Sequence, residues 1–130
     1  MSTSITAGAV IYAKNLDRVS TFYAEVTGLK VTEKEDDYVV LESSSFQLVV
    51  LQIPSEIASA IEIANPPVRR EDAAVKPIFL IPNLSIARTL AAQFGGELNP
   101  AEQEWQFQTF RVCDGRDPEG NVIQLRELVC

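Results

Sequence analysis

The sequence predicts an α+β fold built from two similar modules, each with the element order β-α-β-β-β. The first observation is an internal repeat, because residues 9–29 align with residues 77–97 at a constant offset of 68. The second is that both copies carry an asparagine, an amphipathic run and a glycine at matching places, which is the pattern of a capped helix. The third is that each expected helix is followed by three strand-like runs.

In the first half, the helix is expected to begin after Asn15 and to stop at Gly28. Its apolar residues recur at three- and four-residue steps, so one face of the helix is apolar. One strand is expected before the helix, and three more at residues 30–34, 38–42 and 46–53. The apolar helix face consists of Leu16, Val19, Phe22, Tyr23 and Val26.

In the second half, Asn83 and Gly96 take the places of the cap and the stop. A strand is expected before this helix and others at residues 97–98, 106–113 and 121–127, with a turn over 114–120. We expect one domain over residues 1–130, with a first module at 1–53, a connector at 54–74 and a second module at 75–130. The modules are expected to share one core, because neither four-stranded sheet could bury a face alone.

The composition argues against several classes of partner. Eighteen acidic and eleven basic residues give a net charge of −7, and no basic cluster is present, so nucleic acid is not expected as a partner. The longest apolar runs have strand length, so no membrane span is expected. No signal peptide is recognisable at the start, so a cytoplasmic protein is expected, with Cys113 and Cys130 as reduced thiols rather than a disulfide.

Three stretches together resemble the vicinal oxygen chelate superfamily, which includes glyoxalase I, extradiol dioxygenases, fosfomycin-resistance proteins and bleomycin-binding proteins. They are NLDRVSTFYAEVTGLKV at 15–31, PNLSIARTLAAQFGGEL at 82–98 and DPEGNVIQLRE at 117–127. The resemblance implies that the two modules curl into one cup of mixed sheet, usually within a homodimer. It also implies a divalent metal in the cup, held by four side chains that are typically His and Glu or Gln.

The positions that correspond to the metal ligands of the family lack suitable donors here. By the family pattern they are Gly8, Lys76, Gln124 and a position on the strand over 46–53, taken as Val50 with Leu48 as the alternative. The chain contains no histidine. Only Gln124 offers an oxygen, and the ammonium group of Lys76 would repel a cation. The sequence therefore predicts neither a metal nor another cofactor.

Strand alternation assigns residues to the inside of the expected cup. The strand over 106–113 places aromatic residues on one parity, which suits either stacking on a planar ligand or packing in a dimer. Lys76 could equally reach solvent, and Arg111 could pair with an acidic neighbour or with an anionic ligand. The candidate ligand-binding residues are Val10, Tyr12, Leu48, Val50, Lys76, Ile78, Trp105, Phe107, Arg111, Gln124 and Arg126.

The function expected from these features is the binding of a small molecule without metal, either in the cup or at the cleft of a homodimer. An enzyme of the superfamily type, a lyase or dioxygenase with an atypical metal site, is the alternative. A third possibility is an interaction protein whose cup is filled by its own side chains, such as Tyr12, Phe46 and Leu80. No catalytic residue is assigned, since no acidic residue falls at an expected cup position.

Overall fold

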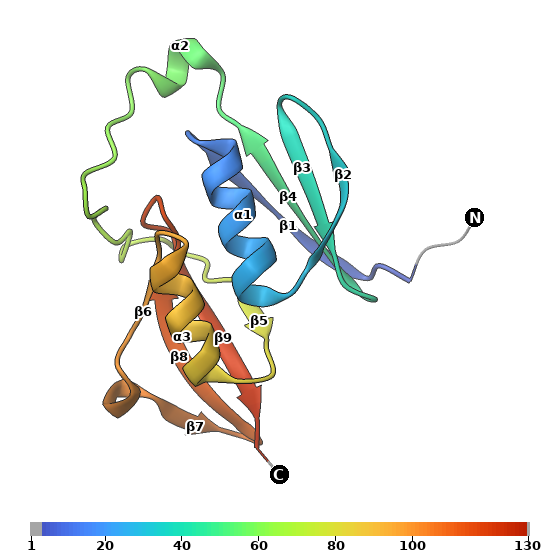
Figure 1. Cartoon of the computed structure of the whole chain (residues 1–130), viewed down its shortest axis with the longest axis vertical. Helices are drawn as coiled ribbons and strands as arrows, with labels where there is room; N and C mark the ends of the chain where they lie inside the picture. The colour runs from blue at the N-terminus through green and yellow to red at the C-terminus, as the bar shows by residue number, and fades with distance from the viewer. Residues whose placement is uncertain (1–3, 130) are drawn as a thin grey trace.

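The structure is a computed structural model that describes residues 4–129. It contains two mixed sheets, with strand order β1-β4-β3-β2 in the first and β5-β9-β8-β6 in the second, where β7 also pairs with β8 (Figure 1). The predicted α+β class is confirmed. The first half contains β1 (Ala7–Ala13), α1 (Leu16–Thr27), β2 (Lys30–Lys34), β3 (Tyr38–Glu42) and β4 (Phe46–Gln52). The second half contains β5 (Ile78–Leu80), α3 (Leu84–Gln93), β6 (Glu97–Leu98), β7 (Trp105–Phe107), β8 (Phe110–Arg116) and β9 (Val122–Leu128).

The segment between the halves carries one short helix, α2 (Ser55–Ala58). Three prolines and several polar residues keep the rest of this segment irregular. It runs around the outside of the molecule from β4 to β5 (Figure 1). No helix in the described residues is long and apolar enough to cross a membrane.

Both long helices begin at the asparagines that the repeat identified. The side-chain oxygen of Asn15 accepts from the Arg18 amide at 3.1 Å, and that of Asn83 accepts from the Ile86 amide at 2.9 Å. Gly28 ends α1 with a left-handed φ of 78°. After α3, however, the left-handed residue is Gly95, with φ 92°, so the stop lies one residue before the predicted Gly96.

Gly96 is needed for a different reason, which is the close approach of the two modules. A Cβ at this position would lie 2.2 Å from a ring carbon of Phe22 and 2.5 Å from the Arg116 carbonyl oxygen. Both distances are far below van der Waals contact, so a larger residue would push α1 away from the second sheet.

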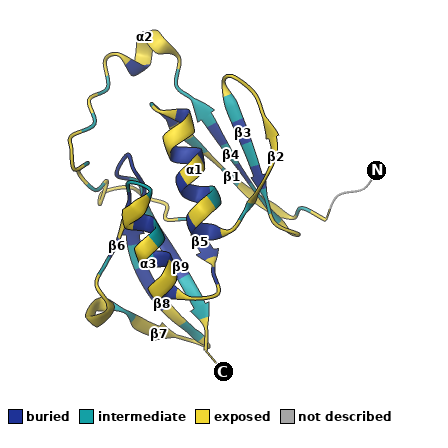
Figure 2. Ribbon diagram, in the orientation of Figure 1, coloured by how far each residue is buried: buried dark blue, intermediate teal, exposed yellow. Residues whose placement is uncertain are grey.

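One hydrophobic core joins the two halves. Phe22 and Tyr23 of α1 are fully buried, and the ring of Tyr23 lies 5.6 Å from that of Phe79 in β5. Helices α1 and α3 contact each other and cover the same side of the two sheets, where the buried residues gather (Figures 1 and 2). Each fully buried large side chain contributes about 1.5–3 kcal/mol, so this shared core holds the modules together.

The turn DPEGN links the second module to α1. Asp117 is fully buried and accepts from the Tyr23 hydroxyl at 2.8 Å, from the Glu119 amide at 2.9 Å and from both nitrogens of Asn121. Burial, together with the negative charge of Asp117, raises the pKa of Tyr23 well above its usual value. The carboxylate of Glu119 accepts from the amides of Lys14 and Asn15 at 2.8 and 2.7 Å. Asp117 and Glu119, expected only to form the turn, therefore also join the modules.

The strand predicted over 106–113 is wrong in its bounds. The chain instead forms a hairpin, with β7 and β8 on either side of a tip where Gln108 has φ 53°. Because β8 continues to Arg116, Asp114 lies in a strand and not in the turn to which the sequence assigned it. The polar residues Gln108 and Thr109 form the turn of this hairpin. Gly115 allows β6 to lie close to β8, because a Cβ at this position would be 3.0 Å from the Cα of Leu98.

Cys113 is a free, buried thiol, whose sulfur lies 3.3 Å from the Asn99 carbonyl oxygen. Burial raises the pKa of this thiol, and the neighbouring Arg88 only partly opposes that effect. Cys130 lies outside the described residues, so its expected state is not addressed.

Candidate functional site

The faces of the two sheets that point away from α1 and α3 are called here the open face. Alternate residues of every strand lie on it, because successive side chains of a strand point to opposite sides. Gly8, Val10 and Tyr12 of β1 are on this face, and the last two are 52% and 64% exposed. Ile78 and Leu80 of β5 are there too, 45% and 65% exposed. These residues lie on the side to which the sequence assigned them.

Leu48 and Val50 are not on the open face, contrary to expectation. Both are fully buried in the core that β4 shares with α1. The parallel pairing of β1 with β4 sets this orientation, because it places Ala9 opposite Leu48 and Ile11 opposite Val50. Val49 and Leu51 are the residues of β4 on the open face. The sequence could not choose, because both parities of FQLVVLQ carry apolar residues.

In the second sheet, residues on the open face form three rows across the strands. The rows follow from the strand register, since residues directly opposite each other share a face. Trp105 and Phe107 are 40% and 46% exposed, whereas Val112 is fully buried between longer neighbours. The rows are Ile78–Gln124–Asp114, then Leu80–Arg126–Val112–Trp105, then Leu128–Phe110–Phe107.

A chain of polar side chains crosses these rows. The Lys76 ammonium donates to Asp114 at 2.8 Å, and the Gln124 amide nitrogen donates to the other carboxylate oxygen of Asp114 at 3.1 Å. The Gln124 amide oxygen in turn accepts from the Arg126 Nε at 2.8 Å. Gln124 is only 8% exposed. Its two charged partners hold its amide in one orientation.

Arg126 is also held by aromatic rings. Its guanidinium carbon lies 5.0 Å from the centre of the Phe107 ring and 5.5 Å from that of the Phe110 ring. Both distances fit cation–π attraction. Phe110 and Asp114 are members of this cluster that sequence reasoning missed, because the hairpin and the true end of β8 were not recognised.

Arg111 lies on the opposite side of the sheet from Trp105 and Phe107, so its assignment to the same face as them is wrong. Because the chain turns back between β7 and β8, Arg111 pairs with Gln106 and lies on the same face as that residue. Its Nε donates to Glu104 at 3.0 Å, and Glu104 also pairs with Arg88. Burial alone would raise the pKa of Glu104, but the hydrogen bonds from these two arginines lower it below its usual value.

Two cavities lie at the seam between the modules. One, of about 290 Å³, is lined by Val10 and Tyr12 of β1 together with Arg70, Val75, Pro77 and Val122. The other, of about 410 Å³, is lined by Ile78 and Leu80 together with Phe46 and the serines at 43–45. Tyr12 and Leu80 therefore line these cavities in the single chain and do not fill a closed interior. An interaction protein with a filled cup would require such side chains to fill it.

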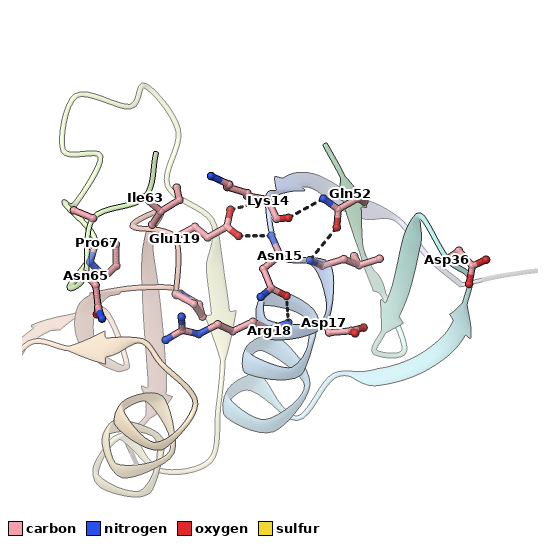
Figure 3. Close-up of a pocket in the computed structure, with 13 residues that line it drawn as sticks. Lys14, Asn15, Asp17, Arg18, Asp36, Gln52, Ile63, Asn65, Pro67 and Glu119 are labelled. Carbon is pink, nitrogen blue, oxygen red and sulfur yellow. Dashed lines mark hydrogen bonds between the residues drawn. The ribbon is translucent and has the colours of Figure 1, made fainter. Parts of the chain in front are cut away.

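A further cavity, of about 560 Å³, lies between the start of α1 and the connector (Figure 3). It is polar, and the amides at the beginning of α1 point toward it. These amides are already bonded, because Glu119 accepts from Lys14 and Asn15, Gln52 accepts from Leu16 at 3.2 Å, and Asn15 accepts from Arg18 (Figure 3). The protein itself thus supplies acceptors for four of the amides at the start of this helix.

The residues at the family's metal positions do not fit a divalent metal. The repeat makes Val10 equivalent to Ile78. Val10 pairs with Val49, and Ile78 pairs with Gln124. Val49, and not Val50 or Leu48, is therefore the first-half counterpart of Gln124. A Cβ at Gly8 would lie 2.5 Å from the Gln47 carbonyl oxygen, so the strands leave no room for a ligating side chain there. Lys76 and Arg126 add positive charge on either side of Gln124. The described residues contain no cluster of three or more His, Cys, Asp or Glu side chains suited to a metal.

The fold agrees with solved structures of one superfamily. A glyoxalase/bleomycin resistance protein/dioxygenase family enzyme from Burkholderia phytofirmans PsJN superposes with a TM-score of 0.67 at 15% identity, covering 94% of this chain and 97% of that one. A lactoylglutathione lyase from Agrobacterium tumefaciens superposes with a TM-score of 0.57 at 22% identity, covering 98% of this chain and 96% of that one. A genomically encoded fosfomycin resistance protein from Listeria monocytogenes superposes with a TM-score of 0.63 at 12% identity, covering 98% of this chain and 94% of that one.

The chain therefore has the fold of the vicinal oxygen chelate superfamily, as the resemblance predicted. At these identities the likeness establishes the fold and not the chemistry. No protein-family model matches the chain, and a search of curated proteins found no match. Any conclusion about function must therefore come from the residues on the open face.

Proposed function

We propose that this protein binds a small, partly apolar molecule on the open face of its second sheet, without a metal. The observation that carries this proposal is the polar chain from Lys76 to Arg126 set among exposed aromatic and aliphatic side chains. Sites for small molecules combine mostly apolar walls with a few oriented polar groups. The candidate residues are Lys76, Ile78, Trp105, Phe107, Gln124 and Arg126 of the second half, together with Val10 and Tyr12 on the open face of the first sheet.

The exposed residues support the proposal because large apolar side chains rarely gather on a surface without a partner. Tyr12, Leu80, Trp105 and Phe107 are all at least 40% exposed and all point to the open face. On the helix-facing side, by contrast, Ala13, Phe79 and Leu125 are buried in the core. The open face therefore contains a large part of the apolar surface that the fold leaves uncovered in the single chain.

A second copy of the chain is the proposed cover for the open face. With a net charge of −7 on each copy, two chains repel each other over most of their surfaces. The open face is the exception, since its exposed residues are largely apolar, and a symmetric dimer needs a surface that matches itself. In such a homodimer the ligand would lie in the cleft between the copies. The cytoplasmic location expected from the sequence stays a prediction.

The proposal can be tested with phenylnaphthylamine, an uncharged fluorescent probe, in buffer containing EDTA. Trp105 is the only tryptophan, so energy transfer from tryptophan to the probe reports binding beside it. We expect saturable transfer, weakened about tenfold in Phe107→Ala, because losing one aromatic wall costs about 1.4 kcal/mol or more. Ile86→Ala, an exposed aliphatic residue on α3, serves as the control and should bind like the wild type.

Absence of transfer, or equal transfer in Phe107→Ala and the wild type, would contradict binding at this face. Transfer that requires added Mn²⁺ or Zn²⁺ would return the protein to the metal-dependent alternative. Thermal unfolding of each variant checks that the fold is retained.

A further inference from the structure

We infer that the ligand carries an anionic group, such as a carboxylate, sulfonate or phosphate, and that Arg126 binds it. This inference rests on the proposed binding site and names the chemical class of its ligand. Arg126 lies in the middle row of the second sheet, between Leu80 and Val112, with Trp105 at the end of the same row. An anion on Arg126 would therefore place the apolar part of the same molecule against Trp105 and Leu80.

The guanidinium of Arg126 is held in place with part of its donor capacity unused. Its Nε is occupied by the Gln124 amide oxygen, and two aromatic rings lie within 5.5 Å of its carbon. Within residues 4–129 its two terminal nitrogens make no hydrogen bond and no ion pair. Two parallel N–H donors on one rigid plane match the two oxygens of a carboxylate.

The charges around Arg126 leave it without a compensating partner. Asp114 is the acidic group of this cluster, and its two oxygens are taken by Lys76 and Gln124. Lys76, Asp114 and Arg126 together therefore carry one net positive charge on the open face of an acidic protein. By contrast, Arg88 and Arg111 on the other side of the sheet are both paired with Glu104.

Gln124 has a defined role in this arrangement. Because Asp114 accepts from its amide nitrogen, its amide oxygen must point to Arg126, which prevents the guanidinium from turning away. Gln124 is thus a positioning residue, although the family pattern places a metal ligand there. An uncharged carbonyl oxygen on Arg126 leaves the positive charge available for the ligand, whereas a glutamate at the same position would neutralise it.

The test compares two probes of nearly the same shape, anilinonaphthalene sulfonate and phenylnaphthylamine, of which only the first carries a charge. Both accept energy from Trp105. Arg126→Gln keeps a donor for Gln124 but removes the charge and the fork. We expect it to weaken the sulfonate probe about tenfold or more, and to weaken the uncharged probe much less, because that probe loses only the apolar contact with the side chain. Arg126→Lys should lie between, because it restores the charge without the fork.

Arg111→Gln is the matched control, since it removes the same charge one strand away on the opposite side of the sheet. It should leave the binding of both probes unchanged. Increasing salt should weaken the sulfonate probe in the wild type and have little effect in Arg126→Gln.

Equal loss of both probes in Arg126→Gln would mean that Arg126 only shapes the site, and it would overturn the inference. Unchanged binding of the sulfonate probe would do the same. If the wild type binds neither probe beside Trp105, the proposed function fails instead. Binding of the uncharged probe alone would leave the site intact and reject an anionic ligand.

Discussion

Single polar side chains in this protein are oriented by charged partners. Gln124 joins Asp114 of β8 to Arg126 of its own strand, and Glu104 joins Arg88 of α3 to Arg111 of β8. Gln124 lies on the open face and leaves the positive charge of Arg126 uncompensated. Glu104 lies on the other side and pairs with both Arg88 and Arg111, so the charges there are used for structure.

Glu104→Gln should lower the free energy of unfolding by about 1–3 kcal/mol at neutral pH, because two arginines lose a charged partner. The folded-state pKa of Glu104 lies below its unfolded value, which is near 4.3. The stabilisation is therefore complete above that value and is lost as the pH falls through the lower folded pKa. Urea unfolding at several pH values measures both variants. A difference that persists unchanged at pH 3 would contradict this account.

Among the elements, the DPEGN turn and helix α1 depend on each other although they belong to different halves. Asp117 holds the Tyr23 hydroxyl, and Glu119 holds the amides that precede α1. The sequence identifies a turn in this region, and in the structure Gly120 takes a left-handed φ of 89°. It does not identify the partners, because they lie about a hundred residues away along the chain.

Glu119→Ala should destabilise the protein by about 1–3 kcal/mol, because two backbone amides lose their acceptor in a partly buried place. Chemical unfolding followed by circular dichroism measures the change. Glu102→Ala, which removes an exposed acidic residue from the short helix Ala101–Gln103, is the control and should change stability by less than about 0.5 kcal/mol. Equal effects of the two substitutions would show that the link between the modules contributes nothing.

For the molecule as a whole, the open face is the surface through which we propose that two copies associate. Tyr12 of the first sheet and Leu80 and Trp105 of the second are exposed on the open face. Helices α1 and α3 cover the other side of the sheets (Figure 1). The proposed dimer explains why side chains such as Leu80 remain exposed in the single chain. In that dimer, the second copy would close over the proposed binding site.

Leu80→Asp should convert the dimer into a monomer, because it places a charge in the apolar contact. Sedimentation velocity gives the mass of each variant. Ile86→Asp is the control, since Ile86 is 61% exposed and Leu80 65% exposed, but Ile86 lies on α3 away from the open face. We expect it to stay dimeric. A monomeric wild type, or loss of the dimer in both variants, would reject the open face as the interface.

The sequence by itself determined the class of fold, the repeat and the helix caps, because those depend on local periodicity and on side chains that bond their own helix. It also determined that Gly8 and Lys76 cannot serve as metal ligands, since this depends on residue type alone. Only the tertiary structure decided that Leu48 and Val50 are buried, since FQLVVLQ is apolar on both faces and its orientation comes from pairing with β1. The β7–β8 hairpin turned Arg111 away from the open face, and the pairing of β8 with β9 placed Asp114 on it, because strand register decides which face a residue occupies.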